Sequence, residues 1–314
     1  MTALTEPVVV AAPTTRRARL TAIRHPKILA GMAILGCFLL LAISQPILEA
    51  TIWRGQEFMY DPQFGFDSSV THPSAPSAEH WLGTSSLGRD VFSMLAFATR
   101  PTLLVAFSAA IAIAVVSLVL GSVAAVRRGW VDGFVSHLSD AMVLLPAMLA
   151  VFILGIGRSN AEFGAVQLGL SFGVLYGLGP ATATIRAAAL TVVAHPFMDA
   201  ARVAGGGSVW IVTRHVLPLL YAFAAVQAMI GATGAVIADA FLSFRSAVGE
   251  DVGFGQMVYD GLVWAELMAG VTETPWWIML AGAGGITLLA AAFYLIGVGL
   301  REALDPRMRE RETA

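Results

Sequence analysis

Residues 199–218 combine charged, glycine and proline residues in one segment between two long apolar stretches. The segment opens with Asp199-Ala200-Ala201-Arg202, passes through Gly205 and Trp210, and ends with Arg214-His215-Val216-Leu217-Pro218. An otherwise apolar chain has few uses for a structured, charged loop, and the main one is to hold a soluble partner. We therefore expect these residues to form a protein-binding surface.

Three consecutive glycines divide the segment into two parts, because glycine is unfavourable inside a helix. We expect a short helix over 195–204, with Pro196 in its first turn, and a second over 208–216, with Ser208 as its N-cap. Pro218 is expected to break the chain path before the next apolar stretch. Composition alone favours a simpler interpretation, an amphipathic helix lying at the membrane surface.

The composition of the whole chain indicates a membrane protein. The 314 residues are 57% hydrophobic and 13% charged, with a mean hydropathy of +0.75, whereas a soluble domain carries about 25% charged residues. Cys37 is the only cysteine, which excludes an internal disulfide and a multi-cysteine metal site. The net charge of -2 says little about function.

Six apolar stretches are long enough to cross a bilayer as helices, since a span needs about 20 residues. The sequence therefore predicts an all-α polytopic membrane protein. The six predicted spans are residues 28–48, 102–126, 134–157, 163–185, 217–240 and 276–300.

The positions of the basic residues predict the orientation of these spans. With a cytoplasmic N-terminus, fourteen Arg and Lys residues fall in inside segments and five in outside segments. Both termini and the 199–218 segment are then cytoplasmic. The predicted organisation is a cytoplasmic tail (1–27), a first helix (28–48), an extracytoplasmic segment (49–101), a core of five helices (102–300) that includes the loop 190–218, and a cytoplasmic tail (301–314).

Three polar or helix-breaking residues near the spans are candidates for a pathway or for helix packing. Asp140 is expected to pair with a neighbouring helix, because a carboxylate near the interface costs less than one at the bilayer centre. Asp239 fits two roles equally well, contact with a substrate amine or a hydrogen bond to the following loop. Pro146 is expected to kink its helix.

The predicted outer segment contains His72, Glu79, His80 and Asp90. Their spacing matches no defined metal site. We expect them to be solvated loop residues.

Four stretches resemble signatures of one family and follow its order. They are 80–93 (HWLGTSSLGRDVFS), the 199–218 segment, 239–244 (DAFLSF) and 299–307 (GLREALDPR). The 199–218 segment resembles the EAA loop, in which a short helix docks into an ATPase. Together they resemble the C-type permease subunit of the dipeptide, oligopeptide and nickel branch of bacterial ABC importers. Asp199 stands where that family usually has glutamate, and residues 245–251 replace a glycine- and proline-rich stretch.

This resemblance implies a type I importer fold in the bacterial inner membrane and a role in moving short peptides. The implied partners are a B-type permease, two ATP-binding subunits or one fused ATPase chain, an extracytoplasmic binding protein and membrane lipid, with no nucleic acid. ATP and magnesium would be bound by the ATPase subunits, so the chain itself would hold no cofactor or metal and would not be an enzyme. It also implies a structural pair between Arg89 and Asp90. The residues implied in coupling are Asp199, Ala200, Ala201, Arg202, Gly205, Arg214, His215 and Pro218.

Several alternatives remain at this stage. The same machine could carry nickel chelates, haem, antimicrobial peptides or glutathione-like tripeptides. A secondary transporter would need charges deep in the spans and related halves, which the sequence lacks. A membrane enzyme would need acid, base or metal ligands clustered at one depth, and no such cluster is apparent. The absence of a GxxxxGK[ST] motif indicates that ATP hydrolysis occurs elsewhere.

Overall fold

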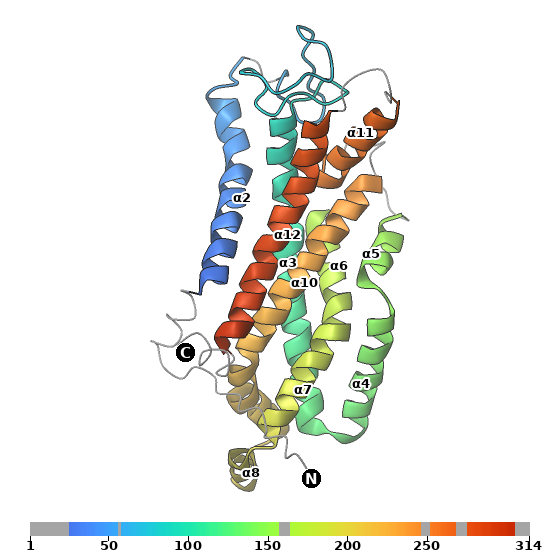
Figure 1. The fold of residues 1–314 in the computed structure, drawn as a ribbon. Coiled ribbons are helices and arrows are strands. Elements are labelled where there is room, and N and C mark those ends of the chain that lie inside the picture. Colours follow the sequence, from blue (N-terminus) through green and yellow to red (C-terminus); the bar gives the residue numbers. More distant parts are fainter. Residues whose placement is uncertain (1–24, 56–57, 157–163, 246–251, 268–274, 305–314) are drawn as a thin grey trace, which may run out of the picture.

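The computed structural model describes residues 25–55, 58–156, 164–245, 252–267 and 275–304. They form a bundle of long, roughly aligned helices with loops at one end and a short projecting helix, α8, at the other (Figure 1). We call these the cap end, formed by residues 51–55 and 58–90, and the α8 end. Within the described ranges there is no strand, only an isolated bridge between Thr84 and Asp90 in the cap.

Eleven α-helices and two π-helical segments make up the described bundle. In chain order they are α2 (Pro26–Ala50), α3 (Val91–Arg127), α4 (Gly129–Leu144), α5 (Ala147–Ile156), α6 (Ala165–Tyr176), η2 (Gly177–Ala181), α7 (Thr182–Val193), α8 (Pro196–Val203), α9 (Ser208–Ile211), η3 (Val212–Val216), α10 (Leu217–Arg245), α11 (Phe254–Leu267) and α12 (Trp276–Leu304).

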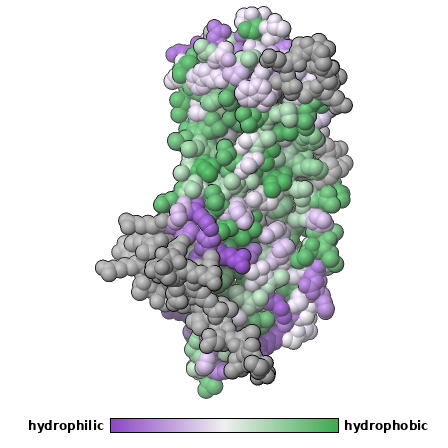
Figure 2. Space-filling view, viewed as in Figure 1, coloured by the Kyte–Doolittle hydropathy of each residue, from purple (hydrophilic) through white to green (hydrophobic). Residues whose placement is uncertain are grey.

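Five helical stretches are long and apolar enough to cross a membrane. They are Pro26–Ala50, Val91–Arg127, Ala165–Val193, Ser208–Phe244 and Trp276–Leu304. The all-helical fold and these five spans agree with the sequence prediction. Figure 2 shows the matching surface, a hydrophobic band around the middle of the visible face and a paler, more polar cap.

The predicted third span, 134–157, is not one long helix. Its residues divide between α4 and α5, which separate at Leu145 and Pro146. Leu145 has φ -88° and ψ 108°, because a residue that precedes proline is disfavoured in the helical region. Pro146 thus interrupts the helix, as expected, and the sixth span stays a prediction.

The second span begins earlier than its predicted start at residue 102. Helix α3 starts at Val91, and the Asp90 carboxylate caps it by accepting a hydrogen bond from the Ser93 amide at 2.8 Å. The predicted start placed Arg100 and Pro101 outside the span, but both lie inside the helix. The charge of Arg100 is accommodated because its Nε donates to the Ala42 carbonyl of α2 at 2.7 Å.

Helix α3 is the centre of the bundle and packs against α2, α6, α7 and α10. Close packing with α6 depends on small residues, since a Cβ at Gly173 would lie 2.6 Å from the Ala109 carbonyl oxygen. Aromatic side chains fill the half of the core toward the cap, where Phe38 meets Phe254 at a centroid distance of 6.4 Å.

The two ends of the described chain lie together at the α8 end. Lys27, at the start of α2, forms an ion pair with Glu302 near the end of α12, and His25 Nε2 lies 3.4 Å from the same carboxylate. Helix α2 also packs along α12. The first and last spans are therefore joined at this end of the molecule.

Candidate functional site

Helix α8 is held to the bundle by one buried side chain. Pro196 occupies its first turn, following His195 in an extended conformation. Met198 is fully buried and packs with Ile185 and Leu220 in the core cluster nearest the α8 end. Because the remaining side chains of α8 lie outside this core, the helix forms a small knob at the end of the bundle (Figure 1).

The outward face of α8 is both charged and apolar. Asp199 and Ala200 are exposed, and Val203 is 90% exposed. Arg202 Nη1 donates to Asp199 Oδ1 at 2.9 Å, so the two charges predicted to meet a partner are paired with each other. An exposed pair of this kind contributes little to stability. It is therefore available to exchange for contacts with another protein.

A glycine in a left-handed conformation ends α8. Gly205 has a φ of +86°. The Gly206 amide donates to the Ala201 carbonyl at 3.1 Å, and the Gly205 amide donates to the Arg202 carbonyl at 3.0 Å. These two bonds form a Schellman motif, which satisfies the last carbonyls of the helix. The predicted short helix and its glycine turn are present at the predicted positions.

The second part of the segment differs from the prediction in two ways. Ser208 is the first residue of α9 rather than its N-cap, and Gly207 precedes it in an extended conformation without a side-chain cap. Pro218 does not break the chain path, because Ser208–Phe244 is one continuous helical stretch. The π-helical turn η3 lies directly before it and provides the irregular backbone hydrogen bonding that a proline inside a helix requires.

The predicted residues Arg214 and His215 lie on η3, close to the turn. Arg214 is exposed, whereas the His215 ring contacts Trp210 at a centroid distance of 4.7 Å. Trp210 in turn closes over Gly206, where a Cβ would lie 2.8 Å from the indole ring. These contacts fix how α9 leaves the turn.

The three candidates in or near the spans have separate environments. Asp140 is exposed on α4 and has no hydrogen bond or ion pair within the described residues, although its charge interacts with that of Arg186 on α7. The expected pairing of α4 with a neighbour is instead made by Asp132, which accepts two hydrogen bonds from Arg186 of α7. Asp239 accepts a hydrogen bond from Thr102 Oγ1 of α3 at 2.6 Å. The loop after α10, which the second expected role of Asp239 involves, lies outside the described residues.

The cap contains a buried network that the sequence did not reveal. His80 is 1% exposed, with Nδ1 2.8 Å from Asp90 Oδ1 and Nε2 3.2 Å from Asp67 Oδ2. The hydrogen bond that His80 donates to Asp90, aided by the one it donates to Asp67, raises the pKa of His80 despite burial. Hydrogen bonds from Ser69 lower the pKa of Asp67. The expectation that His80 and Asp90 are solvated is wrong.

The network also corrects the implied pair between Arg89 and Asp90. Both oxygens of the Asp90 carboxylate are already engaged, one with His80 and one with the Ser93 amide. A signal for this existed in the sequence, because an aspartate just before an apolar helix is a typical N-cap. Asp67, the other hydrogen-bond partner of His80, lies far enough away in the chain that no local pattern identifies it.

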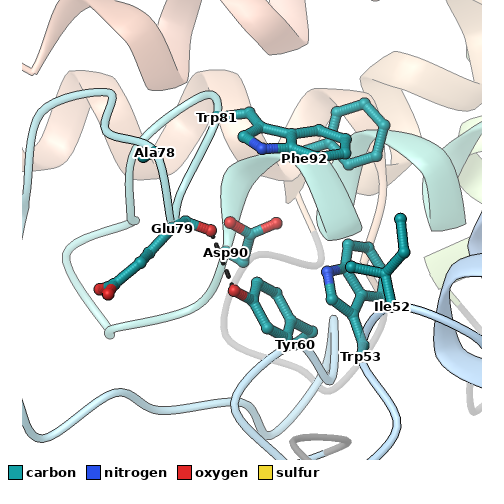
Figure 3. Close-up of a pocket in the computed structure, with 8 residues that line it drawn as sticks. All are labelled: Ile52, Trp53, Tyr60, Ala78, Glu79, Trp81, Asp90 and Phe92. Carbon is teal, nitrogen blue, oxygen red and sulfur yellow. Dashed lines mark hydrogen bonds between the residues drawn. The ribbon is translucent and has the colours of Figure 1, made fainter.

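Beside the network lies a small cavity of about 120 Å³ lined by aromatic side chains (Figure 3). Trp53 stacks on Tyr60 at a centroid distance of 4.6 Å, and Trp81 meets Phe92 edge-on at 5.0 Å. Tyr60 Oη donates to the Glu79 carbonyl at 3.0 Å. Within the described parts of the chain, no three His, Cys, Asp or Glu residues are grouped as metal ligands would be.

Comparison with known proteins places these features in context. The profile of a family described as "Binding-protein-dependent transport system inner membrane component" matches residues 117–310. The chain is 28% identical to the dipeptide transport system permease protein DppC of Alkalihalophilus pseudofirmus, over 89% of this chain and 85% of that protein. It is 28% identical to DppC of Bacillus subtilis, over 90% and 82%. It is 32% identical to a putative peptide transport system permease protein of Brucella suis, over 74% and 76%.

Proposed function

The chain belongs to the family of binding-protein-dependent transport system inner membrane components, and we propose that it is the permease subunit of an ATP-driven importer of short peptides. The cargo follows from relatives named for dipeptide and peptide transport. The observation that carries the mechanism is the α8 knob, which is exposed, anchored by Met198, and placed between two membrane-spanning stretches.

In this proposal α8 is the element that receives force from an ATPase. Ala200 and Val203 offer a close-packing apolar contact, while Asp199 and Arg202 exchange their mutual pair for partner charges. Because α8 follows α7 and precedes the α9–α10 stretch, a push on it tilts both spans as rigid bodies. Arg214, His215 and Pro218 support the base of the knob.

The remaining features of the machine follow the same proposal. The chain has six spans, with both termini and α8 on the cytoplasmic side. The joining of Lys27 to Glu302 at the α8 end supports this topology. A B-type permease completes the pathway, a binding protein delivers cargo at the cap, and two ATP-binding subunits or one fused chain bind ATP and magnesium. This chain contributes no ATPase site of its own.

The test is to purify the tagged chain in mild detergent, identify the proteins that accompany it, and measure ATPase activity in proteoliposomes. We expect a second permease and ATPase chains, with hydrolysis stimulated by a binding protein loaded with di- or oligopeptides. Stimulation by haem or nickel chelates but not by peptides would support the ATP-driven importer and contradict the peptide cargo. Purification of the chain without an ATPase would contradict the proposed role of α8.

A further inference from the structure

A groove at the α8 end has a polar rim and an apolar floor. Three residues of α3, Val119, Val123 and Arg127, line one wall at four-residue spacing, so they share one face of that helix. Residues of α9, η3 and α10 line the other wall. These are Ser208, Val209, Val212, Thr213 and Leu217. The volume of the groove is about 350 Å³, within the range of small-molecule sites.

Polarity changes along the length of this groove. Arg127 lies at the end of α3 and Ser208 at the start of α9, so both polar residues stand at the same end. From Arg127 to Val119 the wall runs about 12 Å at the rise of an α-helix, and valines replace arginine along it. Thr213 adds little polarity, because its hydroxyl already donates to the Val209 carbonyl at 2.9 Å.

The apolar walls are open rather than packed. Val119 is 50% exposed and Val209 is 68% exposed. The positive charge at the rim is also unmatched, since no ion pair or hydrogen bond engages the Arg127 guanidinium within the part of the chain that the structure describes. Arg128 adds a second exposed cation, and Trp130, 82% exposed, follows as interfacial tryptophans do.

We propose that this groove binds one anionic phospholipid, with its phosphate at Arg127 and an acyl chain along the valines. Basic pockets between spanning helices at the membrane surface suit anionic headgroups, and each nearby cation strengthens binding by about fivefold. A neutral protein helix would fill the apolar part and leave Arg127 without a counter-charge. Since α9 forms one wall and follows α8 in the chain, a lipid bound there would contact α9 and thereby stabilise the position of α8.

The test measures lipid binding to the detergent-purified importer complex by native mass spectrometry. Phosphatidylglycerol is titrated against phosphatidylcholine of the same chain length. We expect one phosphatidylglycerol to bind at least fivefold more tightly than phosphatidylcholine, and Arg127→Gln to lower that preference about fivefold. The matched control is Arg301→Gln, an exposed arginine near the end of α12 at the same end of the bundle, which should keep it.

A second variant tests the apolar part of the wall that α3 forms. Val123→Trp fills the groove and should remove the bound phosphatidylglycerol while the complex stays intact. Equal binding of both lipids to the unmodified complex, or an equal loss in Arg127→Gln and Arg301→Gln, would overturn the proposal. Loss of the second permease from Val123→Trp would also overturn it, because the groove would then be a protein interface. None of these measurements depends on the cargo that the importer carries.

Discussion

Gly205 determines the shape of the exposed loop. Its positive φ closes the Schellman motif that ends α8, although a Cβ there would meet no neighbouring atom. A β-branched residue is therefore excluded by backbone conformation and not by lack of space. The sequence located this turn correctly, because the glycine requirement of a left-handed residue is local.

We predict that Gly205→Val uncouples transport from ATP hydrolysis. A left-handed conformation costs about 1–2 kcal/mol for a residue with a Cβ, so α8 would adopt a different exit path. Peptide uptake in proteoliposomes should fall at least tenfold, while the complex that contains the variant keeps hydrolysing ATP. Gly207→Ala is the matched control, since Gly207 has a φ of -71° and open space at its Cβ. Normal uptake by Gly205→Val would contradict the proposed role of this turn in coupling.

His80 is expected to stabilise the cap through its charge, so its contribution to the free energy of unfolding should depend on pH. Its pKa is raised above 6.5, so protonated His80 stabilises the fold fully below pH 6.5, and this contribution is lost as pH rises through the raised value. The pKa of Asp67 is lowered below 3.8, so its contribution is present above pH 3.8 and is lost as pH falls through the lowered value.

The network should therefore stabilise the fold most between the lowered pKa of Asp67 and the raised pKa of His80. We expect His80→Gln to lower the melting temperature of the purified protein most at mildly acidic pH, with the difference from the unmodified protein shrinking in alkaline buffer. His137→Gln, at an exposed position on α4, serves as the control. A difference that is constant from mildly acidic to alkaline pH would show that His80 acts by packing alone.

At the scale of elements, the helices are irregular next to three prolines, although Pro46 and Pro101 lie within the α-helices α2 and α3. Pro146 separates α4 from α5, and Pro180 lies within η2. Pro218 follows η3 without ending the helix. In each case the missing amide is accommodated by a break or a widened turn, which the sequence alone could not distinguish. The choice depends on the neighbours of each helix.

Helix α4 is tied to α7 through Asp132 and Arg186. The pair is partly buried, with side-chain exposures of 23% and 27%, and Arg186 donates two hydrogen bonds. We expect Asp132→Asn and Arg186→Gln each to destabilise the protein. A double-mutant cycle should give a coupling energy of about 1–2 kcal/mol, above that of an exposed pair. Thermal unfolding of the four proteins in one detergent measures it, and additive effects would show that the pair contributes nothing.

At the scale of the whole molecule, the ends of the described chain and α8 lie at one end of the bundle, and the cap lies at the other (Figure 1). An exposed pair of charges marks one end and a buried charge network the other. This difference between the two ends suits a protein that meets different partners on the two sides of a membrane.

The proposed topology predicts opposite labelling of the two ends. Cys37 is the only cysteine, so Cys37→Ser gives a cysteine-free background. Ser208→Cys should react with an impermeant maleimide only in inside-out vesicles, and Ser77→Cys only in intact cells or spheroplasts. Both serines are exposed. Labelling of both sites from the same side would contradict the orientation predicted from the arginines.

The sequence by itself determined the membrane class, the approximate positions of five spans and the short helix with its glycine turn. These depend on hydropathy and on local backbone preference, both of which can be read along the chain. Only the tertiary structure decided the contacts of His80 with Asp67 and Asp90, and the pairs Thr102–Asp239 and Asp132–Arg186. Such contacts join residues far apart in sequence, because a buried charge takes whichever partner the packed helices bring within reach.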